Sequence, residues 1–166
     1  MSYSTFFTLN HIESINNPEC LIKFNDLIVT EGFNESINIF DDKIIVLNLD
    51  CVEAKNAFCE NRSRRSTMDC TFAIQISSNN DFEMLLIELR FNYISVRNLN
   101  RQKLLDKVSG SKNSLGNGTN ISHRNIFVFN KALKEQAKNR LFRMLPKIPN
   151  NYEVMDIFEL NNTFIK

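Results

Sequence analysis

The stretch from Met68 to Tyr93, MDCTFAIQISSNNDFEMLLIELRFNY, contains two apolar runs separated by a polar turn. Thr71 to Ile76 alternates partly with polar residues, whereas Phe82 to Phe91 is apolar at most positions. The residues between them, Ser77 to Asp81, are of the types that form tight turns. The pattern predicts a β-hairpin whose second strand is buried on both faces of a sheet.

Three charged residues interrupt this apolar hairpin. Asp69 lies at its entrance, and Glu88 and Arg90 lie near its far end. Strand residues two apart point to the same face, so Glu88 and Arg90 share one side of the sheet. A buried charge has to be paired, solvated at a cleft or bound to a metal. The three residues are therefore candidates for a functional site, and the alternative is a purely structural pair between Glu88 and Arg90.

The same residues resemble the core motif of the PD-(D/E)XK nuclease-like superfamily, in which an Asp opens one hairpin strand and Glu-x-Lys lies on the next. Asp69 and Glu88 match the two acids, and Arg90 stands in place of the Lys. The resemblance implies that Asp69 and Glu88 bind Mg²⁺ and that the protein hydrolyses phosphodiesters. Because Arg stays protonated, Arg90 is expected to neutralise the scissile phosphate rather than activate water. Glu53 is a further candidate carboxylate from the preceding helix.

Length and composition indicate a single globular domain over residues 1–166. The chain has 166 residues, of which 43% are hydrophobic and 23% charged, as in ordinary soluble proteins. The N-terminal residues lack the pattern of a secretory signal, which predicts a cytoplasmic location and no membrane partner. The cysteines are scattered without a CxxC pair, which predicts free thiols and no zinc site. They are Cys20, Cys51, Cys59 and Cys70.

Charge is divided unevenly along the chain. Residues 1–89 hold 6 Lys and Arg against 14 Asp and Glu, whereas residues 90–149 hold 13 against 2. This asymmetry predicts a polyanionic partner, DNA or RNA, for the basic part. The alternatives are that the two halves pack against each other, or that a protein of complementary charge binds. The candidate nucleic-acid-binding residues are Arg62, Arg64, Arg65, Arg101, Lys134 and Lys138.

Periodicity and turn residues predict an α/β order of elements around the hairpin. The final segment, Val154 to Ile165, is expected to form a strand or hairpin, and residues 110–125 a mobile loop. The expected helices are Pro18 to Glu31, Cys51 to Glu60 with Asp50 as its cap, Arg97 to Lys112 and Lys131 to Leu145. The expected strands outside the hairpin are Ser36 to Phe40, Lys43 to Leu49 and Asn125 to Asn130. With the resemblance, this order implies a central mixed sheet flanked by helices, as in the restriction-endonuclease-like sandwich.

Two functions follow as hypotheses. The first is a Mg²⁺-dependent nuclease, or a nucleic-acid-binding protein derived from one. The second is a non-catalytic interaction or immunity-type protein of a bacterial defence or toxin system, built on the same fold. They differ in whether Asp69 and Glu88 converge on a metal and whether the basic part binds nucleic acid.

Overall fold

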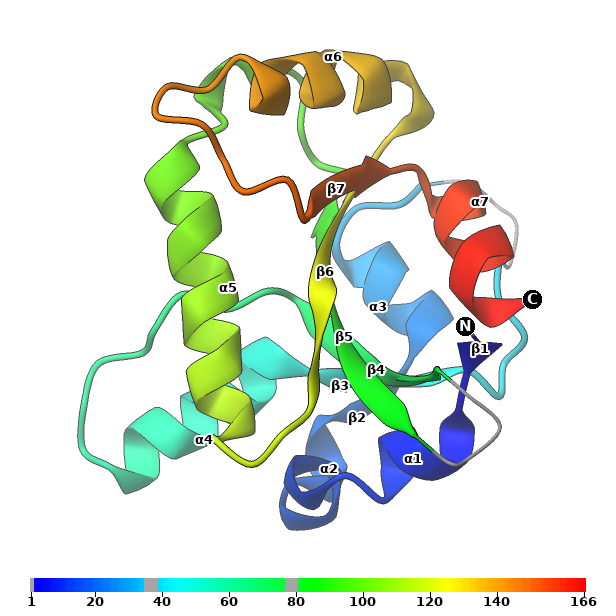
Figure 1. The fold of residues 1–166 in the computed structure, drawn as a ribbon. Helices are drawn as coiled ribbons and strands as arrows, with labels where there is room; N and C mark the ends of the chain where they lie inside the picture. The colour runs from blue at the N-terminus through cyan, green and yellow to red at the C-terminus, as the bar shows by residue number, and fades with distance from the viewer. Residues whose placement is uncertain (1, 35–38, 77–80) are drawn as a thin grey trace.

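A computed structural model describes residues 2–34, 39–76 and 81–166. These residues form an α/β fold around a mixed, open sheet of seven strands (Figure 1). The strand order is β2-β3-β4-β5-β6-β7, and β1 pairs with β4. The strands are β1 (Ser2–Tyr3), β2 (Leu21–Lys23), β3 (Ile45–Asn48), β4 (Cys70–Gln75), β5 (Phe82–Arg90), β6 (Ile121–Phe129) and β7 (Tyr152–Met155).

Helices cover both faces of the sheet: α4, α5 and α6 lie on one side, and α3 and α7 on the other (Figure 1). The helices are α1 (Thr5–Leu9), α2 (Ile12–Asn16), α3 (Phe24–Thr30), α4 (Leu49–Cys59), α5 (Arg101–Leu115), α6 (Lys131–Phe142) and α7 (Ile157–Leu160). Two 3₁₀ turns, Pro18–Cys20 and Val96–Asn98, and a π-helical segment, Asn161–Ile165, complete them. The prediction of a mixed sheet between helices is confirmed.

The central hairpin is present as predicted. β4 and β5 pair antiparallel, with Cys70 opposite Ile87 and Gln75 opposite Phe82, while residues 77–80 of the turn lie outside the described residues. Alternate residues of β5 enter different cores: Leu86 packs on the α5 side, and Leu85 and Ile87 pack on the α3 side. β5 is therefore buried on both faces, and Glu88 and Arg90 project toward α5.

Several predicted boundaries were wrong. Residues 18–31 form a 3₁₀ turn, the short strand β2 and α3 rather than one helix, because Leu21, Ile22 and Lys23 pair with β3. The C-terminal strand ends at Met155, where Asp156 forms a capping box with Glu159 and starts α7. The cap of α4 is Asn48, whose side chain accepts the N–H of Cys51, and not Asp50. The expected strand Ser36 to Phe40 lies largely outside the described residues.

The expectation of free thiols was wrong for two of the four cysteines. Cys20 and Cys51 form a disulfide that joins the 3₁₀ turn to α4, with their Cα atoms 5.5 Å apart. Cys59 and Cys70 are free. The two partners are 31 residues apart in sequence, so their pairing depends on tertiary packing that no local spacing reveals. None of the described helices is both long enough and apolar enough to cross a membrane.

The expected mobile loop at 110–125 is mostly regular structure. α5 continues to Leu115 and β6 begins at Ile121, so only residues 116–120 connect them. Gly110 and the two serines that follow it on the same face are buried within α5. The small residues that suggested a loop instead allow the helix to approach another segment closely.

Gly110 gives the first testable prediction. A Cβ at this position would lie 2.0 Å from the backbone oxygen of Ser66, which cannot rotate away. Ala normally favours a helix over Gly by about 1 kcal/mol, but here we expect Gly110→Ala to destabilise the fold by about 1–3 kcal/mol through overpacking. Urea unfolding measures the change, and Gly118→Ala, with no atom within 4 Å of its Cβ, is the control. Equal stability of the two variants would contradict this close contact.

Candidate functional site

The side chains of Asp69, Glu88 and Lys107 meet where β4 begins and β5 ends. The Nζ atom of Lys107 lies 2.7 Å from Oε1 of Glu88 and 3.6 Å from Oδ1 of Asp69. One ammonium group on α5 thus contacts both acids of the hairpin. All three side chains are largely buried, with 19%, 2% and 8% of Lys107, Glu88 and Asp69 exposed.

Hydrogen bonds fix Asp69 between β5 and the start of α4. Its Oδ2 atom accepts the N–H of Leu89 on β5 at 2.5 Å, and its backbone oxygen accepts the N–H of Leu49 at 3.1 Å. The residue just before it is held as well, because the N–H of Met68 donates to Oγ of Ser111 on α5. That hydroxyl in turn donates to the backbone oxygen of Lys107. The position of Asp69 is therefore tied to the helix that carries Lys107.

Arg90 lies beside Glu88, as the alternation along β5 predicts. Its Nη2 atom is 2.7 Å from Oε1 of Glu88, and its Nη1 donates to Oη of Tyr93. The guanidinium carbon is 4.9 Å from the centroid of the Tyr93 ring. Its Nε is buried and has no hydrogen-bond partner among the described residues. Arg90 is thus an immobilised cation with one donor left unused.

Burial and like charges shape the ionisation of this site. Burial, together with the nearby Asp69, raises the pKa of Glu88 to about 8, although Arg90 and Lys107 oppose the shift. Burial also raises the pKa of Asp69. Burial alone would lower the pKa of Lys107, but the two carboxylates outweigh it and raise that pKa. Lys107 is therefore a protonated cation held between two acids at neutral pH.

Lys107 is not among the site residues predicted from the sequence, although the helix that carries it was expected. Lys107 lies three residues after Leu104 and four before Ser111, on one stripe of α5 that faces the sheet. The signal that identifies this stripe is the run of small residues Gly110, Ser111 and Ser114, all buried. A search for apolar residues at helical spacing treats serine as a solvent-facing residue, so it does not identify this buried face of α5.

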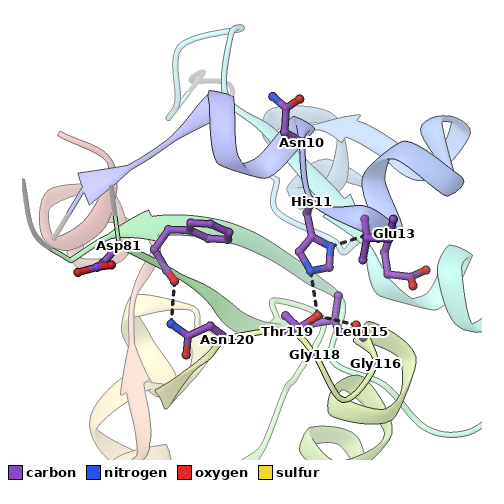
Figure 2. Close-up of a pocket in the computed structure, with 11 residues that line it drawn as sticks. Asn10, His11, Glu13, Asp81, Leu115, Gly116, Gly118, Thr119 and Asn120 are labelled. Carbon is purple, nitrogen blue, oxygen red and sulfur yellow. Dashed lines mark hydrogen bonds between the residues drawn. The ribbon is translucent and has the colours of Figure 1, made fainter. Parts of the chain in front are cut away.

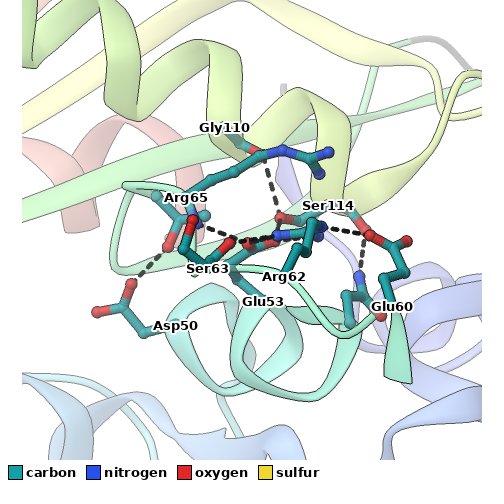
Figure 3. Close-up of polar contacts among 10 residues, drawn as sticks. Asp50, Glu53, Glu60, Arg62, Ser63, Arg65, Gly110 and Ser114 are labelled. Carbon is teal, nitrogen blue, oxygen red and sulfur yellow. Dashed lines mark hydrogen bonds and ion pairs between the residues drawn. The ribbon is translucent and has the colours of Figure 1, made fainter. Parts of the chain in front are cut away.

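Glu53 belongs to a different cluster (Figure 3). Its carboxylate accepts hydrogen bonds from Nη1 of Arg62 at 2.5 Å, the N–H of Arg65 at 2.7 Å and Oγ of Ser114 at 2.7 Å. Burial would raise its pKa, but the hydrogen bonds from these three residues outweigh burial and lower the pKa to about 2. Glu53 therefore joins α4, the loop at 61–67 and α5, and does not supply a third acid to the Asp69 site.

The candidate nucleic-acid-binding residues are placed very differently from one another. Arg62 is engaged by Glu53 and Glu60, whereas Arg64 and Arg65 are exposed. Lys134 was expected to be free to bind nucleic acid, but its side chain is only 14% exposed. Its Nζ atom lies 2.8 Å from Oδ2 of Asp156 and 2.7 Å from Oε1 of Glu159.

On the outer face of α6, Lys138 lies 3.3 Å from Glu135. Arg101, at the start of α5, is half-buried and donates to the backbone oxygen of Lys147. Of the candidate cations, Arg64, Arg65 and Arg101 therefore have side chains without a carboxylate partner among the described residues.

Comparison with protein-family models, curated proteins and solved structures finds no match for this chain. Its site is therefore interpreted from its own geometry.

A separate pocket of about 560 Å³ lies at the other end of β5, between the N-terminal helices and the loop before β6 (Figure 2). His11 in its wall is buried, and its Nδ1 accepts the N–H of Glu13. Its Nε2 lies 3.0 Å from Oγ1 of Thr119, whose hydroxyl donates to the oxygen of Leu115. Nε2 must therefore be the donor, and the ring is the neutral tautomer that carries its proton there.

This arrangement predicts acid-sensitive stability. Burial lowers the pKa of folded His11 below 6.5, so its contribution is complete above pH 6.5 and is lost as pH falls toward the folded pKa. The loss amounts to about 1.4 kcal/mol for each unit by which the pKa is lowered. We expect His11→Asn, which keeps a side-chain oxygen to cap α2, to reduce the loss of unfolding free energy as the pH is lowered. Urea unfolding of both proteins at pH 7.5, 6.5 and 5.5 measures it, and parallel profiles would contradict a role for His11.

Proposed function

We propose that this protein is a metal-dependent phosphodiesterase of the PD-(D/E)XK type that acts on nucleic acid. The observation that carries the proposal is the convergence of Asp69, Glu88 and Lys107 from three separate elements of a mixed sheet and its helix. Arg90 departs from the motif on the strand, and Lys107 supplies from α5 the amine that the strand lacks. A restriction-endonuclease-like sandwich is the finer fold that we propose with it.

The acids of the site fit a hard divalent cation. Asp69 and Glu88 offer only oxygen ligands, and Mg²⁺ commonly uses one or two protein carboxylates with water and substrate phosphate. No cluster of three or more ligating His, Cys, Asp or Glu occurs within the described ranges, so we assign Mg²⁺ to Asp69 and Glu88 alone. When bound, Mg²⁺ supplies charge for the phosphate and lowers the pKa of its water.

The raised pKa values around the site support this assignment. Burial and the charges of Asp69 and Asp50 raise the pKa of Glu31, at the end of α3, and the pKa values of Asp69 and Glu88 are raised as well. These buried carboxyl groups thus favour protons even though Lys107 and Arg90 lie beside them. A divalent cation would stabilise their ionised forms in place of those protons.

The chain's own groups have distinct roles in this proposal. Asp69 is fixed by the N–H of Leu89, and Glu88 is oriented by Arg90, so neither acid has to reorganise on binding. Because its pKa is raised, Lys107 keeps its proton at Nζ. It therefore stabilises negative charge on the phosphate or gives a proton to the leaving oxygen, and does not act as a base.

The test is cleavage by the unmodified protein. Labelled single- and double-stranded DNA and RNA are incubated with Mg²⁺, Mn²⁺, Ca²⁺ or EDTA, and products are separated on denaturing gels. We expect cleavage with Mg²⁺ and Mn²⁺ and none with EDTA. Titration calorimetry of Mg²⁺ is the second readout. The absence of both cleavage and Mg²⁺ binding would refute the proposal.

A second candidate is a non-catalytic interaction protein, and one observation favours it. Lys107 and Arg90 already neutralise Glu88 without any metal, which is the arrangement of a structural ion network. On this reading, the exposed charges face a protein partner of a defence or toxin system. Absent metal binding together with intact folding would support this candidate over the nuclease.

A further inference from the structure

Two pockets adjoin each other at the start of α5, and both are lined by Leu99 and Asn100. One, of about 470 Å³, extends toward Arg90 and Lys107 of the candidate site. The other, of about 410 Å³, lies between α5 and the end of α6. α6 and the segment after it lie across this end of α5 (Figure 1). The two hollows therefore share part of their lining at the start of α5, and one of them reaches the candidate site.

The first pocket joins the site through its cations. Lys103 lines it together with Lys107, one helical turn further on, and with Arg90. The two lysines are four residues apart, which places them about 6 Å apart along the helix axis and on the same side. Lys103 is exposed and makes no ion pair with any described residue. Its ammonium group thus remains available to an anion.

The second pocket contains three more cations, Arg101, Arg140 and Arg143. None of them forms an ion pair within the described part of the chain. Among the described residues that line either pocket, the single acid is Asp106, which accepts a hydrogen bond from Gln102. The positive end of the α5 dipole also lies here, between the two groups of cations. Lys107 and Arg90 are paired with the acids of the candidate site. The four cations without an ion pair, Lys103 and the three arginines, still outnumber the one carboxylate and make this path attractive to a polyanion.

We propose that the two pockets form one track for the sugar-phosphate backbone of a single nucleic-acid strand, leading from the Asp69–Glu88 site over the start of α5. The proposal rests on the proposed function, because the track ends at the proposed metal site. It differs from the sequence-based expectation, since Arg62, Lys134 and Lys138 are engaged by carboxylates. Of the candidates from the sequence, only Arg101 lies on the track among the described residues, and Lys103, Arg140 and Arg143 join it there.

An exposed ring near the end of α6, in a neighbouring pocket lined also by Lys138 and Lys147, favours a single strand over a duplex. Phe142 is 79% exposed, and the ammonium of Lys147 lies 6.0 Å from its centroid. Unpaired bases stack on such rings in single-strand-binding proteins, and paired bases cannot.

The test measures binding without cleavage, by fluorescence anisotropy of labelled oligonucleotides in EDTA over a range of salt concentrations. The variants are Lys103→Gln and the pair Arg140→Gln with Arg143→Gln. The matched control pair is Lys112→Gln, on α5 outside both pockets, with Lys131→Gln, which removes the same charge from exposed positions. Phe142→Ala is compared with Phe58→Ala, since Phe58 is 87% exposed on α4.

We expect the arginine pair to weaken single-strand binding at least tenfold at low salt. It should also reduce the slope of log affinity against log salt by about 1.4, at about 0.7 for each contacted phosphate of a single strand. Lys103→Gln should reduce the slope by about half as much, and the control pair should bind within about twofold of the unmodified protein. Phe142→Ala should weaken binding to single strands, and Phe58→Ala should not.

The outcomes separate this proposal from the proposed function. If the protein binds single strands in a salt-dependent way, the track variants lose this binding and no cleavage is detected, the track is supported and the nuclease activity is refuted. Cleavage or binding that the track variants leave unchanged would overturn the track alone. Equal or tighter binding of a duplex would overturn the assignment to a single strand, and no binding of any nucleic acid would overturn both proposals.

Discussion

Replacing Glu88 with Gln should lower Mg²⁺-supported cleavage by at least about 100-fold, the usual scale for losing one preorganised charged group of an active site. The side chain keeps its size but can no longer bind Mg²⁺ as a carboxylate or neutralise Lys107, which lies 2.7 Å away. Asp69→Asn should have a similar effect. Initial rates on labelled single-stranded DNA, with calorimetry of Mg²⁺, measure both variants.

The control for Glu88 lies on the same strand. Glu83 is on β5 near its other end, opposite Ile74, and Glu83→Gln removes the same charge away from the site. We expect Glu83→Gln to cleave at the normal rate. Lys107→Met tests the helix-borne amine and should also abolish cleavage, while near-ultraviolet circular dichroism reports whether each variant is folded. Full activity in a folded Glu88→Gln or Lys107→Met protein would show that catalysis does not use this site.

Glu53→Ala should destabilise the fold by about 3–5 kcal/mol, the usual result of removing one partner from a buried ion pair. The change leaves Arg62, the N–H of Arg65 and the hydroxyl of Ser114 without their common acceptor. Glu53 is 1% exposed, so water does not readily replace its oxygens. The free energy of unfolding in guanidinium chloride measures the loss.

An exposed pair provides the comparison. Glu135 is 71% exposed and 3.3 Å from Lys138 on α6, and such pairs contribute about 0.3–0.5 kcal/mol. Glu135→Ala should therefore change stability by less than about 0.5 kcal/mol. If Glu53→Ala is as mild as this control, the cluster around Glu53 does not hold the loop and helix together.

The features that the sequence predicted correctly are those with local causes. The alternation along β5 follows from strand geometry alone, so the shared face of Glu88 and Arg90 could be read from two positions. The helical stripe of α6 was located in the same way, and its start at Lys131 agrees with the structure. Features that depend on the geometry of a single strand or helix could therefore be predicted from the sequence.

What could not be predicted depends on contacts between distant segments. Lys107 is 19 residues from Glu88 and 38 from Asp69, and only the packing of α5 across the sheet brings it to them. Cys20 meets Cys51 for the same reason. Lys134 was misplaced because its partners, Asp156 and Glu159, belong to a helix that was expected to be a strand. A single-sequence pattern contains no information about such pairings.

The link through Ser111 has a consequence for how the site tolerates sequence change. The N–H of Met68 and the backbone oxygen of Lys107 are joined through one serine hydroxyl. The spacing between the hairpin acid and the helix amine thus depends on one side chain, the hydroxyl of Ser111, placed between two main-chain groups. Exchange of Ser111 for a residue without a hydroxyl would break this link, whereas exchanges at surface positions around it leave the ammonium and the carboxylate where they are.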